Sequence, residues 1–202
     1  DGTKRFVAVA ADGTNRVMYS TDGISWTAAS AAGANFWRSV TYGNGKFVAV
    51  AYSGTNRVMY STNGISWTAA SAAEANGWQS VTYGDGKFVA VSYTGTNKVM
   101  YSTDGISWTA ASAVEANYWF SVTYGNGKFV ATAINGTNRV MYSDDGISWT
   151  TASATEANNW TSVTYGDGKF VAVAGSGTGR VMYSTDGISW TAASAAEDNT
   201  WR

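Results

Sequence analysis

The chain has 202 residues and a formal net charge of −1, and it contains no Cys, His or Pro. Without Cys there is no disulfide framework, and without His or Cys the usual metal ligands and catalytic bases are missing. A net charge near zero argues against nucleic-acid binding, and no apolar run is long enough to cross a bilayer. We therefore predict no metal, no cofactor, no nucleic-acid partner and no membrane insertion.

The composition favours strands over helices. Hydrophobic residues make up 45% of the chain and charged residues 13%, and there are 23 Gly, 10 Trp and 12 Tyr. Aromatic and β-branched residues suit strands, and Gly suits the tight turns between them. We expect an all-β protein.

Internal repetition dominates the sequence, with a period of 41 residues. Two tryptophan series follow this period: Trp26, Trp67, Trp108, Trp149 and Trp190, and then Trp37, Trp78, Trp119, Trp160 and Trp201. A repeat decides the fold when it is present. We predict one domain over residues 1–202, built from units 6–46, 47–87, 88–128, 129–169, and 170–202 plus 1–5.

Each unit contains four short strand-like runs separated by turn residues. In the second copy they are 80–83, Lys87–Ser92, Val99–Ser102 and 106–109, which we call strands A to D. Strands A and B are joined by Asn-Gly or Asp-Gly, dipeptides typical of tight hairpin turns. Four antiparallel strands in about 41 residues match one propeller blade. The sequence predicts a five-bladed β-propeller of four-stranded antiparallel blades.

The five units do not close evenly, because five repeats of 41 would need 205 residues and the chain has 202. The shortage falls where the ends meet, at the equivalent of 39–41. We expect a closing blade that lacks its innermost strand or replaces it with residues 1–4. Truncation, further residues beyond the chain and a longer array all remain open. An incomplete blade also offers a route to self-association.

Packing follows from strand parity, since both faces of strand B are apolar and each must be covered by a neighbouring blade. We expect the Trp26 series to be buried between blades as a main source of this packing. The link from D to the next A has a Ser-x-x-Glu pattern, as in Ser71 to Glu74, which fits a helix capping box. We predict one helical turn there at most.

The stretch Ser20-Thr-Asp-Gly-Ile-Ser-Trp-Thr27 resembles the Asp-box of sialidase-like and related bacterial propellers, although Gly follows Asp directly here. The resemblance implies a propeller fold and a structural Asp in the C–D turn. The residues concerned are Asp22, Asp104, Asp145 and Asp186.

Sialidase chemistry would need an arginine cluster and paired acidic groups converging on one point. The arginines instead fall at one equivalent position of the repeat, occupied by Arg16, Arg57, Arg139 and Arg180 and by Lys98 in the third copy. Symmetry-related positions are spread around a ring, whereas catalysis needs different groups in one place. We predict no catalytic residues and no enzyme activity.

The copies differ mainly at the end of strand B and around the second tryptophan. In an up-and-down blade these positions lie on one face of the ring, where a chemically varied surface is typical of recognition. Divergence by drift in exposed loops is the alternative. The tryptophans of this set are either stacking platforms for sugars or a hydrophobic plug under the loop. The candidate ligand-binding residues are Phe36, Trp37, Arg38, Tyr52, Trp78, Gln79, Tyr93, Tyr118, Trp119, Phe120, Asn135, Asn159 and Trp160.

These observations lead to two hypotheses of function. The first is a non-enzymatic ligand-binding propeller, adhesin-like, that binds glycans or a cell-surface polymer through repeated weak sites. The second is a designed or recently amplified repeat scaffold with no natural ligand, which the near-identity of the copies favours.

Overall fold

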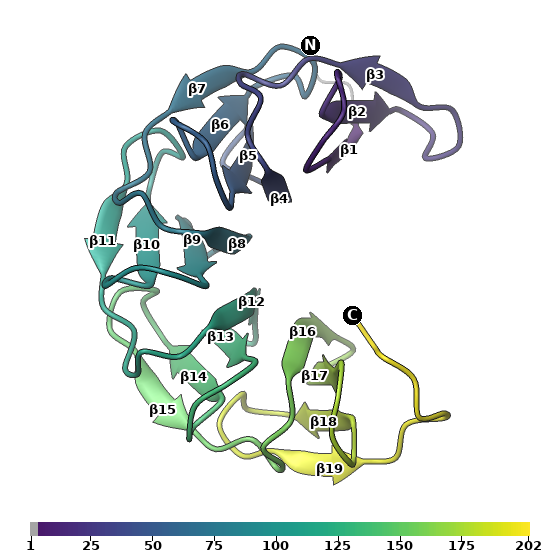
Figure 1. The fold of residues 1–202 in the computed structure, drawn as a ribbon, viewed down its shortest axis with the longest axis vertical. Coiled ribbons are helices and arrows are strands. Elements are labelled where there is room, and N and C mark those ends of the chain that lie inside the picture. Colours follow the sequence, from purple (N-terminus) through teal and green to yellow (C-terminus); the bar gives the residue numbers. More distant parts are fainter. Residues whose placement is uncertain (1–3) are drawn as a thin grey trace.

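The computed structural model of the chain describes residues 4–202, and every regular element within that range is a β-strand. The strands form five antiparallel sheets that stand as blades around a common axis (Figure 1). We number these blades I to V in chain order. The predicted all-β, five-bladed propeller is confirmed.

Blade I has three strands and the other blades have four. Blade I contains β1 (Phe6–Val9), β2 (Val17–Ser20) and β3 (Thr27–Ala29). The innermost strands of blades II to V are β4 (Trp37–Gly43), β8 (Trp78–Gly84), β12 (Trp119–Gly125) and β16 (Trp160–Gly166). The next strands outward are β5 (Lys46–Ala51), β9 (Lys87–Ser92), β13 (Lys128–Ala133) and β17 (Lys169–Ala174). Then come β6 (Val58–Ser61), β10 (Val99–Ser102), β14 (Val140–Ser143) and β18 (Val181–Ser184). The outermost strands are β7 (Thr68–Ala70), β11 (Thr109–Ala111), β15 (Thr150–Ala152) and β19 (Thr191–Ala193).

The outermost strand begins later than the sequence predicts. In blade III the predicted strand D covers 106–109, but β11 starts only at Thr109. The reason lies in the preceding turn, where the carboxylate of Asp104 accepts hydrogen bonds from the N–H groups of Ile106 and Ser107, both at 2.8 Å. These amides are therefore not available to the strand ladder.

The link between D and A forms no helical turn within residues 4–202, which agrees with the limit of one turn at most, but the capping box predicted there does not form. The carboxylate of Glu74 does not cap an N–H group at Ser71. It accepts a hydrogen bond instead from Asn97, which lies in the B–C connection of the blade that follows in the chain. A long-range side-chain partner thus replaces the local capping that the sequence pattern predicted.

Neighbouring blades pack through one repeated apolar interface. Between blades II and III, Val48, Val50 and Val58 of one sheet meet Trp78 and Phe88 of the next, and all five are fully buried. Buried aromatic rings contribute large apolar areas, and each fully buried side chain of this kind contributes about 1.5–3 kcal/mol. The interface explains why both faces of each central strand are apolar.

The two tryptophan series are buried to different extents, and the predicted burial of the Trp26 series between blades holds only in part. Trp37, Trp78, Trp119 and Trp160 are essentially inaccessible to solvent. In the other series Trp149 is buried, Trp67, Trp108 and Trp190 are half-buried, and Trp26 is exposed. The reason is radial position: the Trp26 series immediately precedes the outermost strand, whereas the Trp37 series opens the innermost strand.

Close backbone approach adds to the interface near the axis. A side chain at Gly43 would overlap the ring of Tyr83, since a Cβ built there lies 2.0 Å from the tyrosine Cγ. Gly84 and Gly125 stand in the same relation to Tyr124 and Tyr165 of the following blades. Glycine at this position lets a tyrosine of the next blade lie flat on the innermost strand.

The ring of blades is open between blades I and V (Figure 1). Blade I lacks an innermost strand within residues 4–202, as the sequence predicts. The face of blade I that looks into the opening of the ring has no neighbouring blade to cover it. Phe6 is 57% exposed there and Met18 is 43% exposed, whereas the equivalent residues of blade III, Phe88 and Met100, are 0% exposed. Whether residues 1–3 substitute for the missing strand lies outside the described part of the chain.

Each C–D turn is held by one acidic or amide side chain. The carboxylates of Asp22, Asp104, Asp145 and Asp186 accept the N–H groups of the second and third residues that follow. Asn63 does the same with its amide oxygen in blade II. These hydrogen bonds lower the pKa of Asp22 from 3.8 to about 2, with the Ser25 and Ile24 amides as the largest causes.

Asp104→Ala should lower the free energy of unfolding by about 1 kcal/mol at pH 7, because two turn amides lose their acceptor. Asp104→Asn is the matched control, since Asn63 accepts the same hydrogen bonds in the equivalent turn. Denaturant unfolding of the three proteins measures this difference. Equal losses for Ala and Asn would contradict the assigned role.

The same aspartate carries a pH dependence. Hydrogen bonds from Ile106 and Ser107 lower the pKa of Asp104, so the unfolded chain binds its proton more tightly than the folded chain. The stabilisation is therefore complete above about pH 4 and is lost as the pH falls through the folded pKa. Asp104→Asn removes this component, so its stability should fall less steeply on acidification than that of the wild type. Parallel pH profiles would show that Asp104 contributes nothing.

Candidate functional site

The two variable sets of the repeat lie side by side at one end of each blade. Beyond the A–B ladder, the N–H of Tyr52 donates to the carbonyl of Phe36 at 2.8 Å, and that of Tyr93 donates to Gly77 at 2.9 Å. Blades IV and V repeat this pairing with Tyr118 and Asn159 as acceptors. Main-chain hydrogen bonds therefore bring the end of strand B next to the residue before strand A.

A β-bulge displaces the next variable position. Trp37 pairs with Ala51 and Ser39 with Val50, so Arg38 has no partner in the ladder. The equivalent residues Gln79, Phe120 and Thr161 occupy the same bulge in blades III to V. Arg38 is exposed, Gln79 is buried, and Phe120 and Thr161 are half-buried. Bulges of this kind redirect a side chain away from the sheet.

Four of the predicted binding residues form a continuous row of rings across blades II, III and IV. The rings of Phe36 and Tyr52 meet edge to face at 6.2 Å, and Tyr52 meets Tyr93 in the same way at 6.2 Å. Tyr93 and Tyr118 are stacked at 4.3 Å. Phe36 is 37% exposed and Tyr118 39%, and the two central rings are partly exposed. We call Phe36, Tyr52, Tyr93 and Tyr118 the aromatic ridge.

The ridge depends on a residue without a side chain at its centre. A Cβ at Gly77 would lie 2.7 Å from the ring of Tyr52 and 3.1 Å from the hydroxyl of Thr94. The equivalent positions in the neighbouring blades are Phe36 and Tyr118. Gly77 therefore opens the space through which Tyr52 reaches Tyr93.

Each end of the ridge carries a cation. The guanidinium of Arg38 lies 4.9 Å from the centre of the Phe36 ring, and the ammonium of Lys98 lies 5.1 Å from that of Tyr118. Both distances are within the range of cation–π attraction. The ridge is thus an aromatic strip with a positive group at each end.

Lys98 also ties two blades together. Its Nζ donates to the carbonyls of Tyr93 in blade III and of Ala116 and Asn117 in the link to blade IV, at 3.4, 3.0 and 2.9 Å. Burial lowers the pKa of Lys98. In the other copies arginine makes the equivalent tie, as Arg57 does between Tyr52 and Ala75. This position therefore fixes the loops that carry the ridge.

The tryptophans predicted as binding residues lie beneath the surface. The indole N–H groups of Trp37, Trp78, Trp119 and Trp160 donate to carbonyls of the preceding D–A link, and their rings are buried. A stacking platform needs an accessible ring face, so these four buried residues do not belong to the exposed surface at the loop ends. Their position is that of a plug under the loop.

The two predicted asparagines do not extend the row of rings. The side-chain oxygen of Asn135 accepts the N–H of Tyr118 at 2.5 Å, so it orders the loop at the end of the ridge. Asn159 is exposed in blade V, where its backbone partner is Gly175. Blade V therefore carries no ring at the paired position.

Residues that sequence reasoning did not select complete the site. Lys98 was seen only as a replacement for arginine, and its contact with Tyr118 could not be read from spacing. Gly77 stands where the other copies have Phe36, Tyr118, Asn159 and Thr200, but the space that it leaves is recognised only with the neighbouring ring of Tyr52 in place. In both cases the deviation from the repeat was the available signal.

The described residues offer no obvious place for a metal ion. Within residues 4–202 there is no group of three or more His, Cys, Asp or Glu side chains that could hold one. Over the same range no helix is long and apolar enough to span a membrane.

The fold and the loop-end site define the chain as a five-bladed β-propeller. It is similar to virginiamycin B lyase from Staphylococcus aureus, with a TM-score of 0.77 and 15% identity over 94% of this chain and 69% of that one. It is also similar to YCF48 bound to a D1 peptide, with a TM-score of 0.64 and 14% identity over 94% and 67%. It is similar as well to a chain of a nidogen/laminin complex, with a TM-score of 0.68 and 11% identity over 91% of this chain and 74% of that one. At these identities the likeness shows the fold alone.

No protein-family model matches the chain, and no curated protein matches it. The resemblance to Asp-box propellers is therefore not confirmed as a family relationship.

The expectation that the chain is not an enzyme is contradicted by these comparisons. A propeller of similar fold is a lyase, so the fold does not exclude catalysis. Symmetry of the strands does not exclude a catalytic site, because the loop ends differ from blade to blade and one asymmetric group of side chains is enough for a site.

Lys98→Met should lower the free energy of unfolding by about 2 kcal/mol, because three carbonyls lose a charged donor while the aliphatic stem is kept. Lys98→Arg should cost less than about 1 kcal/mol, since arginine makes the same tie in the other copies. Denaturant unfolding compares the two variants. A Lys98→Met protein as stable as the wild type would contradict the assigned role of Lys98.

Proposed function

We propose that the chain is a ligand-binding propeller and that the aromatic ridge is its binding surface. The observation that carries the proposal is the contact of four rings from three blades, all at positions where the copies differ. Partly exposed aromatic groups on a rigid support are typical of recognition surfaces, because they offer large contact areas at low entropic cost. Propellers with the same fold bind peptide and protein partners.

The ligand class that we propose is a carbohydrate chain. Sugar rings present flat C–H faces that suit partly exposed aromatic rings, and a row of rings spaced along three blades suits several units of one polymer. Several weak contacts along one chain reinforce each other through effective concentration. A glycan of a cell surface is the partner that this geometry favours.

Glycan and peptide arrays probed with the purified chain test the proposal. We expect glycan binding that weakens by about tenfold in Tyr52→Ala and in Tyr118→Ala, because each removes one ring of the ridge. Tyr42→Ala is the matched control, since Tyr42 is an exposed tyrosine at the opposite end of β4. Binding to peptides and not to glycans would show that the proposed carbohydrate ligand is wrong and that the ridge binds a peptide. No binding on either array would overturn the proposal and favour a scaffold without a natural ligand.

We propose in addition that the 202-residue chain associates with a second copy through its end blades. Inside the chain, Val89 and Val91 of blade III belong to the cluster that covers Phe129 of blade IV. Blade V ends in the equivalent Val171 and Val173, which are partly exposed, and blade I begins with the exposed Phe6. The two end faces therefore repeat the two sides of an interface that is already formed within the chain.

Sedimentation velocity over a range of concentrations tests this association. Phe6→Glu and Val173→Glu should each abolish it, whereas Val114→Glu should not, because Val114 is 38% exposed in the link between blades III and IV, away from both end faces. The contact is head to tail, so a mixture of the Phe6→Glu and Val173→Glu proteins should form a dimer through their intact faces. A monomer at every concentration, or a mixture that stays monomeric, would overturn this second proposal.

A further inference from the structure

A half-buried carboxylate joins the two loops at the ridge end of blade III and again of blade IV. In blade III, Glu74 comes from the D–A link and reaches Asn97 of the B–C loop. Its Oε1 accepts the side-chain N–H of Asn97 at 2.5 Å, and its Oε2 accepts the backbone N–H of Asn97 at 3.3 Å and the side chain of Asn76 at 3.0 Å. Glu115 makes the same three hydrogen bonds in blade IV.

Blade II has the donors of this arrangement but not the carboxylate. Gly33 stands where the other blades have glutamate, and Asn35 and Asn56 stand at the positions of Asn76 and Asn97. The side chain of Asn35 still donates to the carbonyl of Asn56, as Asn76 does to Asn97. Within residues 4–202, neither the backbone N–H nor the side-chain amide of Asn56 donates to any acceptor.

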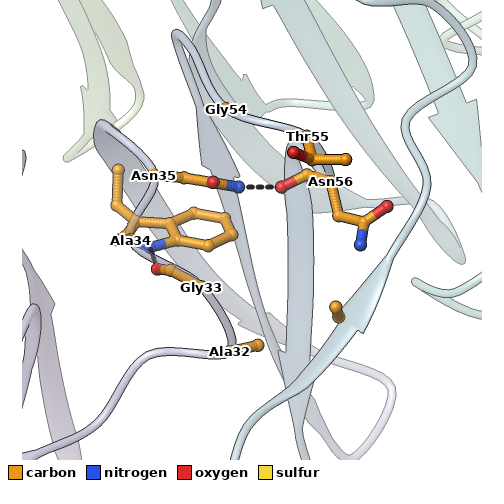
Figure 2. Close-up of a pocket in the computed structure, with 9 residues that line it drawn as sticks. Ala32, Gly33, Ala34, Asn35, Gly54, Thr55 and Asn56 are labelled. Atoms are coloured by element: carbon orange, nitrogen blue, oxygen red, sulfur yellow. Dashed lines mark hydrogen bonds between the residues drawn. The ribbon is translucent and has the colours of Figure 1, made fainter.

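A cavity of about 430 Å³ occupies the place of the missing side chain. Gly33 and Asn35 form one wall and Thr55 and Asn56 form the other, with the Asn35–Asn56 hydrogen bond spanning between them (Figure 2). No acidic residue lines the cavity. The cavity is large enough for a small organic group and lies at the loop that continues into Phe36.

The donor set favours a carboxylate over a neutral group. All three donors of the equivalent site point at the two oxygens of one carboxylate in blade III, and such bonds to an anion are stronger than those to a neutral acceptor. In blade III these donors stabilise the ionised form, since the hydrogen bond from the Asn97 side chain is the largest cause that lowers the pKa of Glu74. The cavity is open to solvent and Asn56 is exposed, so its donors are accessible to an anionic ligand and have no protein acceptor to displace.

We propose that the cavity at Gly33 binds the carboxylate of an external ligand, which takes the place and the hydrogen bonds of the glutamate side chain found in blades III and IV. The predicted contacts are the side-chain amides of Asn35 and Asn56 and the backbone N–H of Asn56. This site does not rest on the aromatic ridge, because its donors and its shape are complete without the rings.

Propionate is the probe, since it reproduces a glutamate side chain from Cβ outward. Titration at constant ionic strength should produce saturable shifts of the Asn56 backbone and side-chain amide signals in ¹H–¹⁵N spectra. Propionamide, its neutral counterpart of the same shape, should bind about tenfold more weakly or not measurably, because it lacks the anionic oxygens. Absence of saturable shifts, or equal binding of the two probes, would overturn the inference.

Two variants make the test specific to the cavity. Gly33→Glu supplies the missing side chain and should abolish propionate binding; a Cβ there lies 3.6 Å from its nearest neighbour atom, so the variant fits. Gly33→Ala is its control and should still bind. Conversely, Glu74→Gly should create a second site, seen as new saturable shifts of Asn97. Binding that persists unchanged in Gly33→Glu would place the ligand elsewhere and overturn the inference.

Discussion

The packing of one blade on the next is the interaction on which the whole structure depends. A single sheet of this repeat has two apolar faces, so it cannot be stable until both are covered. The covering follows one pattern, with a valine face on one side and a tryptophan and a phenylalanine on the other, although Thr132 replaces one valine between blades IV and V. Each blade contacts its neighbours in the chain, and stability is therefore close to a sum of identical interface contributions.

Polar contacts at the loop end convert this stack into a rigid support for a surface. Lys98 and the equivalent arginines hold each B–C loop to the next D–A link. Glu74 and Glu115 hold the two loops of one blade together. Loops held in this way lose little conformational entropy when a ligand binds, and this favours affinity. Two blades depart from this set: blade V has Gly179 in place of the second asparagine, and blade II has Gly33 in place of the glutamate, where the loop end opens into the cavity.

Much of the fold follows from the sequence because the repeat makes local signals unmistakable. The hairpin turns are an example, since Asn44 and Asp85 adopt the positive φ of 45° and 44° that their pairing with glycine predicts. The relative burial of Trp37 and Trp26 could not be predicted, because both recur with the same period and their burial depends on radial position in the ring. Glu74 was assigned to a local cap because its true partner, Asn97, is 23 residues away.

The sequence predicts which residues belong to the candidate site, but it does not predict how their rings contact one another. Phe36, Tyr52, Tyr93 and Tyr118 stand out as differences between copies, yet their contact requires the missing side chain of Gly77 and a blade spacing that no single sequence reveals. The exclusion of enzyme activity failed for a related reason. Symmetry describes the strands, whereas chemistry at the loop ends is decided by the few positions that depart from it.

The hydrogen bonds that pair Phe36 with Tyr52, and their equivalents, use main-chain atoms only. Side chains at these positions can therefore be exchanged without disturbing the register of the hairpin that carries them. A gene of near-identical modules with this property can diversify one module at a time while the others preserve the scaffold. New specificities are then accessible through single substitutions, and these positions are a natural choice for building a library of binders, with Gly77 kept as glycine because a side chain there would overlap the ring of Tyr52.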